Sequence, residues 1–138
     1  MKAAFATWNG RIAPLFDTSR QAHIVEVLSE RVFKEQRECF QDQTPVGKVL
    51  CLVEWGVTTL VCGAISRPLH VIVTAHGIRV ISFVAGDLKE VTHAWLEGRI
   101  HEKGYAMPGY GHRVDGGGAQ GSDPANNPQG KGGGKNEW

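Results

Sequence analysis

The sequence predicts a three-layer α/β domain built around a mixed sheet of five strands. Two apolar, β-branched runs at 58–62 and 79–84 flank a helical segment, which is typical of parallel strands joined by a crossover helix. Two earlier runs are separated only by a short turn, which indicates an antiparallel hairpin. The parallel core and the antiparallel extension together make the sheet mixed, with the expected order β-β-β-α-β-α-β-α.

The strand–helix–strand unit is the centre of this prediction. The run at 58–62 has the composition of a strand buried on both faces. A helix should follow it, because Ser66 can cap its start, Pro68 suits its first turn and Gly77 suits its end. The crossover to the strand at 79–84 should be right-handed.

The residues before this unit extend the sheet. Residues 2–8 are predicted to form the first strand, and the asparagine–glycine pair after them is a strong turn signal. Residues 11–20 are expected to form a loop, since they contain a proline and a polar cluster. The runs at 21–28 and 31–40 form the predicted hairpin.

Two more helices complete the expected layers. The first should begin after Thr44 as its cap and end before Gly56, and the last should begin after Asp87 and end before Gly98. Helical spacing supports both predictions. The residues with this spacing are Val46, Val49, Leu50, Val53 and Glu54 in the first helix, and Leu88, Val91, Ala94, Trp95 and Leu96, which form an apolar stripe, in the last.

Composition excludes several classes of protein. Lysine and arginine total 15 against 14 acidic residues, so the net charge of +1 gives no support for nucleic-acid or anionic-membrane binding. No apolar run reaches the ~20 residues that span a bilayer, and no secretory signal is present, so we expect a cytoplasmic protein. Cys39, Cys51 and Cys62 lack CxxC spacing, which argues against a zinc ribbon or a disulfide framework.

The composition changes near Lys103. Residues 1–103 carry the predicted elements, whereas residues 104–138 are dominated by glycine, proline and small polar side chains. Such a segment buries too little apolar surface to offset the entropy of ordering it. We therefore expect one domain at 1–103 and a disordered, glycine-rich tail at 104–138.

The loops after the first, fourth and fifth strands are the expected functional edge, because ligands of open parallel sheets bind beyond the carboxyl ends of the strands. Backbone N–H groups at a helix start, with an arginine beside them, can bind a phosphate or an anionic cluster. The alternative is a tight strand-to-helix connection flanked by solvated arginines. The candidate residues are Asn9, Gly10, Arg11, Gly63, Ala64, Ser66, Arg67 and Gly86.

Two residues near this edge are candidate metal ligands. Cys62 ends a central strand before a helix N-terminus, where a thiolate is stabilised and could bind iron, copper or molybdenum. The alternative is a buried cysteine that packs against the helix. His70 lies in the first turn of that helix, although a lone histidine is more often structural. The sequence has no HExxH, P-loop or GxSxG motif.

Three segments carry a resemblance to a known family. Residues 1–17 contain an opening strand and an "IAPLF" loop, residues 57–65 and 75–80 contain "GAI" and "AHGIRV" segments, and residues 86–98 form the closing helix. In this order and spacing they resemble the dinitrogenase iron–molybdenum cofactor biosynthesis family, of the NifX and NifB C-terminal type. Met107-Pro108-Gly109 resembles an extension found in some members.

The resemblance implies an RNase H-like fold and, among some members, carriage of iron–sulfur-based clusters such as the nitrogenase cofactor. Two positions depart from the family pattern. Leu15 stands where cofactor-binding members often have histidine, and Tyr110 stands where the extension often has cysteine. Nucleases of this fold hold metals with carboxylates on central strands, and the predicted central strands here have none.

Two functional hypotheses follow. The first is a small, non-catalytic carrier or scaffold that binds an anionic iron–molybdenum or other iron–sulfur-type cluster and exchanges it with a donating or accepting protein. Under this hypothesis Cys62 or His70 supplies a direct ligand. The second is an interaction or regulatory domain that keeps the fold and has lost cluster binding, which Leu15 and Tyr110 favour. The sequence contains no acid–base pair that indicates an enzyme.

Overall fold

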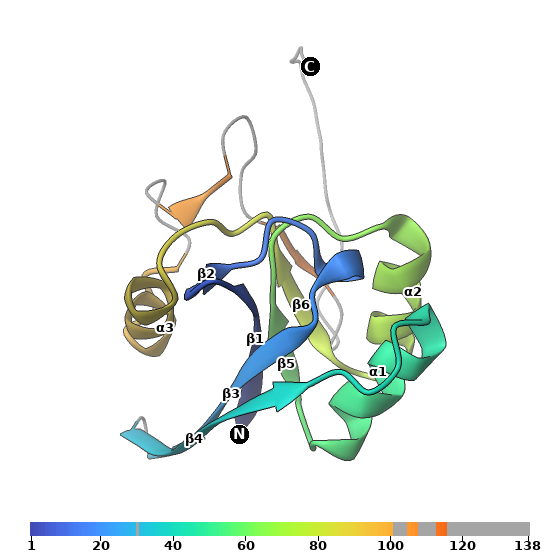
Figure 1. The fold of residues 1–138 in the computed structure, drawn as a ribbon. Helices are drawn as coiled ribbons and strands as arrows, with labels where there is room; N and C mark the ends of the chain where they lie inside the picture. Colours follow the sequence, from blue (N-terminus) through green and yellow to red (C-terminus); the bar gives the residue numbers. More distant parts are fainter. Residues whose placement is uncertain (30, 101–104, 108–112, 116–138) are drawn as a thin grey trace.

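The computed structural model describes residues 1–29, 31–100, 105–107 and 113–115, and Figure 1 shows helices packed on both faces of a mixed sheet. The sheet has the order β4-β3-β1-β5-β6-β7, with β2 paired to β1. The strands are β1 (Lys2–Trp8), β2 (Arg11–Ile12), β3 (Gln21–Leu28), β4 (Arg31–Cys39), β5 (Thr59–Val61), β6 (Arg79–Ser82) and β7 (Arg113–Asp115), and the helices are α1 (Pro45–Glu54), α2 (Arg67–Ala75), α3 (Leu88–Leu96) and a short 3-10 helix, η1 (Phe16–Thr18).

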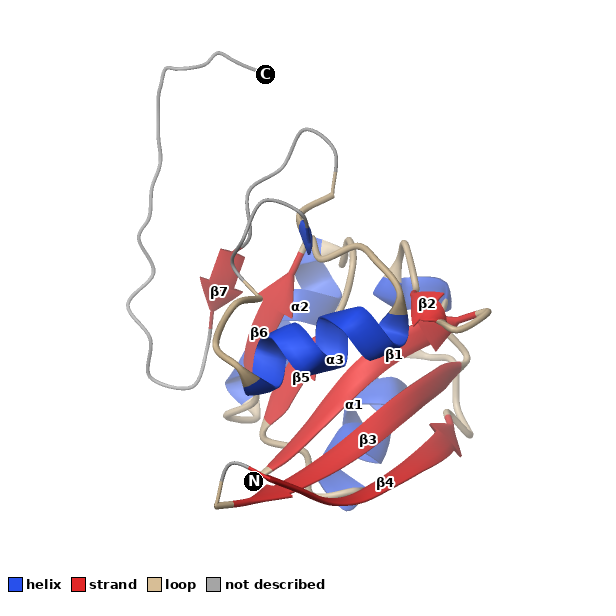
Figure 2. Cartoon of the chain, turned by 90° about the vertical axis from the view of Figure 1, so that its left-hand side faces the viewer, coloured by secondary structure: helices blue, strands red, loops and turns tan. Residues whose placement is uncertain are grey.

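The predicted three-layer α/β class is confirmed. The five predicted strands and three predicted helices are all present, in the predicted order. β1, β5 and β6 run parallel, whereas β3 is antiparallel to both β1 and β4. Helices α1 and α2 cover one face of the sheet and α3 covers the other (Figures 1 and 2).

Two short strands were not predicted. β2 lies inside the expected loop, because Asn9 and Gly10 both take positive φ values (52° and 73°) and fold the chain back into a tight hairpin. β7 lies in the segment expected to be disordered, and it pairs with β6. Residues 105–107 also bond to the chain after β6, through Ala85 N–H to Tyr105 and Met107 N–H to Phe83. The rest of the predicted tail lies outside the described residues.

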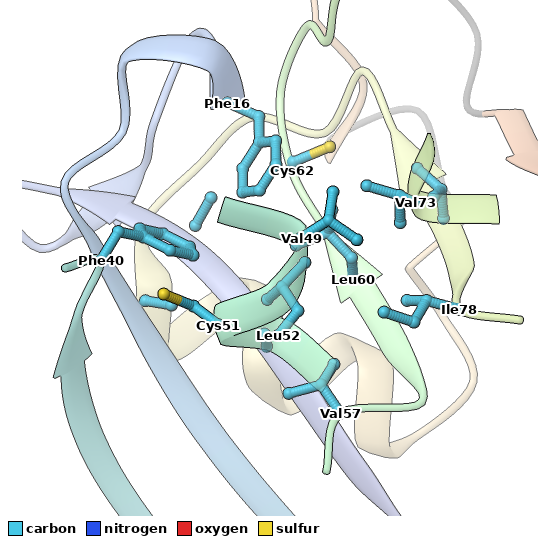
Figure 3. Close-up of a cluster of buried hydrophobic side chains, with 14 of the residues drawn as sticks. Phe16, Phe40, Val49, Cys51, Leu52, Val57, Leu60, Cys62, Val73 and Ile78 are labelled. Carbon is cyan, nitrogen blue, oxygen red and sulfur yellow. The ribbon is translucent and has the colours of Figure 1, made fainter. Parts of the chain in front are cut away.

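The core has two parts, one on each face of the sheet. β1 supplies both, since alternate side chains of a strand point to opposite faces: Ala4 and Ala6 pack under α1 and α2, and Ala3 and Phe5 pack under α3. Figure 3 shows the first cluster, in which Phe16 from the η1 loop lies among side chains of the sheet and helices. The loop after β1 is therefore part of the core.

Helix α1 is present as predicted, but its apolar residues of helical spacing do not all face the core. Val49 is buried, whereas Val46, Leu50 and Val53 are 55%, 53% and 44% exposed. The helix is turned so that Lys48, Cys51 and Leu52 face inward instead. This orientation is compatible with a buried lysine because the Lys48 ammonium has hydrogen-bond acceptors inside the fold, while Val49, Cys51 and Leu52 pack in the core.

Candidate functional site

The carboxyl ends of β1, β5 and β6 meet at one edge of the sheet, as expected. The loop after β1 joins the other two loops there. Phe16 N–H donates to the Ala64 carbonyl and Ala64 N–H donates to the Pro14 carbonyl, both at 2.8 Å. On the other side, Ile12 N–H donates to the Gly86 carbonyl at 3.0 Å. We call this edge, formed by loops 9–20, 62–66 and 83–87, the loop rim.

Gly63 is required by close approach of two loops. A Cβ atom at this position would lie 2.5 Å from the carbonyl oxygen of Ala13 and 2.6 Å from that of Pro14. Backbone atoms cannot move aside as a flexible side chain can. This glycine therefore fits the steric alternative, a tight connection, better than a role in contacting a ligand.

Two of the predicted anion-binding N–H groups already have acceptors inside the chain. Ala64 N–H is bonded to Pro14, and Ser66 N–H donates to Oδ1 of Asp17 at 2.9 Å. Ser66 occupies the N-cap position of α2 as predicted, but its side chain makes no capping hydrogen bond. In this conformation neither N–H group is available to a bound anion.

Lys48 fixes the loop after β1, and its role was not predicted. Its side chain is wholly buried, and Nζ donates to the carbonyl oxygens of Phe16 (2.5 Å), Asp17 (3.0 Å) and Ser19 (2.6 Å). Nζ also lies 4.8 Å from the centre of the Phe16 ring. The three donors of the ammonium thus hold the 3-10 turn in shape.

Burial lowers the pKa of Lys48 from 10.5 to about 8, and the nearby Asp17 carboxylate opposes part of that change. A signal for this role existed in the sequence. Lys48 lies three and four positions before two apolar residues, Cys51 and Leu52, and therefore shares their helix face. A lysine on an apolar face is a candidate for a buried, hydrogen-bonded ammonium.

Cys62 lies in the core and not at the rim surface. The side chain is wholly buried in the cluster drawn in Figure 3. Burial raises the pKa of its thiol strongly, with a further contribution from Asp17. A protonated, enclosed thiol is a poor metal ligand, so the position favours the alternative of a small core residue.

His70 lies half-buried in the first turn of α2, as predicted. Within the described residues, no group of three or more histidine, cysteine, aspartate or glutamate side chains is assembled to hold a metal ion. His70 is therefore not part of such a group in that part of the chain.

The exposed charged side chains in and beside the described rim loops are arginines. Arg11 and Arg67 are exposed there as expected, together with Arg20, which the sequence did not single out. Asn9 is also exposed, at the turn between β1 and β2. Of the rim carboxylates, Asp87 caps α3 through Lys89 N–H and Asp17 binds Ser66 N–H, so both are engaged internally.

An open groove of about 500 Å³ lies beside the rim, where β1 ends and β3 begins. Its apolar wall includes Trp8, which is 61% exposed, and Leu15, which is 38% exposed. Of the predicted site residues only Asn9 lines it. No signal for this groove existed in the sequence, because the exposure of Trp8 and Leu15 is known only from the structure. The lining residues are Thr7, Trp8, Asn9, Pro14, Leu15, Thr18, Ser19, Arg20 and Gln21.

These features define a class of protein: a small α/β domain with an open, mixed sheet, whose loops are joined at the carboxyl edge of the parallel strands. The particular family follows from the sequence match. The chain belongs to the dinitrogenase iron–molybdenum cofactor family, whose family model matches residues 1–98. The resemblance stated from the three segments above is thus confirmed.

Solved structures share the fold. The protein PH0822 superposes with a TM-score of 0.67 at 20% identity, covering 72% of this chain and 93% of that one. MJ0327 from Methanocaldococcus jannaschii gives 0.59 at 19% identity, covering 72% and 90%. The apo orange protein from Desulfovibrio gigas gives 0.60 at 15% identity, covering 71% and 88%. At these identities the likeness shows the fold alone.

A comparison with curated proteins finds no match. Among the described residues, no helix has the length and apolar character needed to cross a membrane.

Proposed function

We propose that this protein is a non-catalytic carrier or scaffold for an anionic metal–sulfur cluster of the iron–molybdenum type, or for a precursor of one, in the cytoplasm. The observation that supports the proposal is that Arg20 lines an open groove, together with the exposure of Arg11 and Arg67 in or beside the neighbouring rim loops. Family membership points to the class of cargo. Arginine suits this task because its charge is permanent and its planar fork donates several hydrogen bonds.

The cluster is held mainly by charge and shape. The rim arginines neutralise the anion, Asn9 donates a hydrogen bond from the turn, and Trp8 and Leu15 form the apolar wall of the groove. Cys62 is enclosed, so His70 is the remaining candidate of the two predicted metal ligands. A cargo held without several protein–metal bonds can leave intact, which is what transfer between a donating and an accepting protein requires.

The test is anaerobic reconstitution of the full chain with iron, sulfide and molybdate, followed by metal analysis and absorption spectroscopy after gel filtration. Wild-type protein should retain metal in fixed stoichiometry. The charge reversal Arg20→Glu should lower retention, because it places a carboxylate at the groove. Lys89→Glu, on the exposed surface of α3, is the matched control and should retain metal as the wild type does.

A wild-type chain that stays free of metal under all these conditions would contradict the carrier proposal. The same preparation then decides the alternative. An interaction domain that has lost cluster binding should instead recover a protein partner in stoichiometric amount from native extract, in the absence of metal.

A further inference from the structure

Strand β4 forms an outer edge of the sheet. It is nine residues long, and no strand of the described part of the chain pairs with its outer side. Its side chains are mostly exposed, including Phe33 at 66%. Such an edge presents a row of backbone N–H and C=O groups that can pair with another strand.

Charged side chains on an edge strand usually prevent it from pairing with another chain. In β4, however, the charges are ordered so that they can match the opposite charges of a second, antiparallel copy of the same strand. A bulge separates Val32 from the regular stretch that begins at Lys34. Within that stretch, Lys34 and Glu35 lie before Gln36, and Arg37 and Glu38 lie after it. The order of signs is therefore plus, minus, neutral, plus, minus.

Two-fold symmetry restricts how β4 can pair with its own copy. Directly opposed side chains in an antiparallel pair point to the same face of the sheet, and the two-fold axis places each residue and its copy on the same face. The axis must therefore pass through a residue that faces its own copy. A pair centred on Lys34, Glu35 or Arg37 sets that charged residue against itself. A pair centred on Gln36 sets Lys34 against the partner's Glu38 and Glu35 against the partner's Arg37, each twice.

We propose that β4 pairs antiparallel with β4 of a second copy of this chain, in the register centred on Gln36. The contacts inside each chain are compatible with it. Glu35 uses one oxygen for His23 Nε2 at 2.7 Å, and Glu38 uses one for Gln36 Nε2 at 2.9 Å, which leaves the second oxygen of each carboxylate. β5 and β6 are separated from β4 by β3 and β1, so the rim loops that follow β5 and β6 lie away from the proposed interface.

The first test measures mass against concentration for the full chain by sedimentation equilibrium. The apparent mass should rise from one chain toward two, and the association should weaken with added salt because the ion pairs are exposed. A chain that stays monomeric at every concentration, up to about 1 mM, where weak interfaces of this small size associate, would overturn the proposal.

The second test uses charge reversal. Lys34→Glu places a carboxylate opposite the partner's Glu38 twice over, so the dissociation constant should rise about tenfold. Lys34→Glu combined with Glu38→Lys restores opposite signs and should restore association. Arg79→Glu changes the net charge by the same amount at an exposed position of β6, with three strands between it and β4, and should leave the association unchanged. Circular dichroism confirms that each variant is folded. A double variant as weak as the single one refutes this register.

The third test reads the register by cross-linking, in a Cys39→Ser background that removes the exposed native thiol of β4. In the proposed register the two copies of position 36 face each other at the symmetry axis. Their Cα atoms then lie within the separation of about 4.4–6.8 Å that a disulfide needs, so Gln36→Cys chains can be linked. The Cα atoms of the two copies of position 34 lie about 13 Å apart along the strands, which is too far to link Lys34→Cys chains. Mild oxidation should link Gln36→Cys chains and leave Lys34→Cys chains separate, and equal linking of the two would contradict the proposal.

Discussion

The carboxylate of Asp17 accepts a hydrogen bond from the backbone N–H of Ser66 at 2.9 Å. This contact joins the loop after β1 to the residue that opens α2, across 49 positions of the sequence. An acidic side chain is also favourable at a helix N-terminus. The Asp17 carboxylate therefore holds two loops of the rim together, a role that neither the helical nor the strand periodicity of the sequence predicted.

Asp17→Ala should loosen this junction. The loss of a charge-assisted hydrogen bond should lower the free energy of unfolding by about 1.5–3 kcal/mol. Urea denaturation measures the change, with Glu54→Ala on the exposed end of α1 as control. Equal stabilities of the two variants would show that the contact contributes nothing.

Lys48→Met should destabilise the fold by about 3 kcal/mol at pH 7, because three buried carbonyl groups lose their donor while side-chain volume is kept. Protection of the loop amides of Phe16 and Ser19 against hydrogen exchange should fall with it. Lys89→Met, which removes an exposed lysine, should change neither quantity. A stable Lys48→Met variant with normal loop protection would refute the role given to this ammonium.

The lowered pKa of Lys48, about 8 against 10.5, also predicts a pH dependence. Between these values the unfolded chain binds more protons at this lysine than the folded chain does. The free energy of unfolding contributed by Lys48 therefore rises as pH increases from about 8 to about 10, and below pH 8 the cost of burying the charge is fully present. Subtracting the pH curve of the free energy of unfolding of Lys48→Met from that of the wild type cancels the contributions of other titratable groups. A difference that stays constant between pH 7 and 10 would contradict the lowered pKa of Lys48.

Thiol labelling distinguishes the three cysteines. Cys39 is exposed and should react rapidly with a thiol reagent at pH 8, whereas Cys51 and Cys62 are buried. The raised pKa of Cys62 further suppresses its thiolate. Mass spectrometry should show one fast site in native protein and three in denaturant. Rapid labelling of native Cys62 would restore it as a candidate ligand.

Gly63→Ala should be more destabilising than a glycine change in open space. The added Cβ meets two carbonyl oxygens at 2.5–2.6 Å, and such overpacking costs about 1–3 kcal/mol. Gly77→Ala meets nothing within 4 Å and carries only the strain of its positive φ, about 1–2 kcal/mol per residue. Gly63→Ala should also lower the protection of the Phe16 amide against hydrogen exchange, because it disturbs the loop packing. Gly77→Ala should leave that protection unchanged.

Local patterns were enough to predict five strands, the three α-helices and their order, but not β2, β7 or η1. The β-branched runs, the caps at Thr44 and Asp87, and the hairpin turn are signals carried by neighbouring residues, and the right-handed crossover rule converts them into a parallel core. The same rule placed the loops after β1, β5 and β6 on one edge. The match of three separate segments in order was enough to indicate the family.

What the sequence by itself determined is therefore the α/β class, the strand and helix order and the edge at which the loops gather, because each depends on short-range pattern or on a general rule of chain topology. Only the tertiary structure decided which groups on that edge are free: it buried Cys62, engaged the N–H groups of Ala64 and Ser66, and turned α1 so that Lys48 faces inward. Those outcomes depend on packing and hydrogen bonds between residues far apart in the chain, and of them only the inward position of Lys48 left a sign in the sequence, its helical spacing to Cys51 and Leu52.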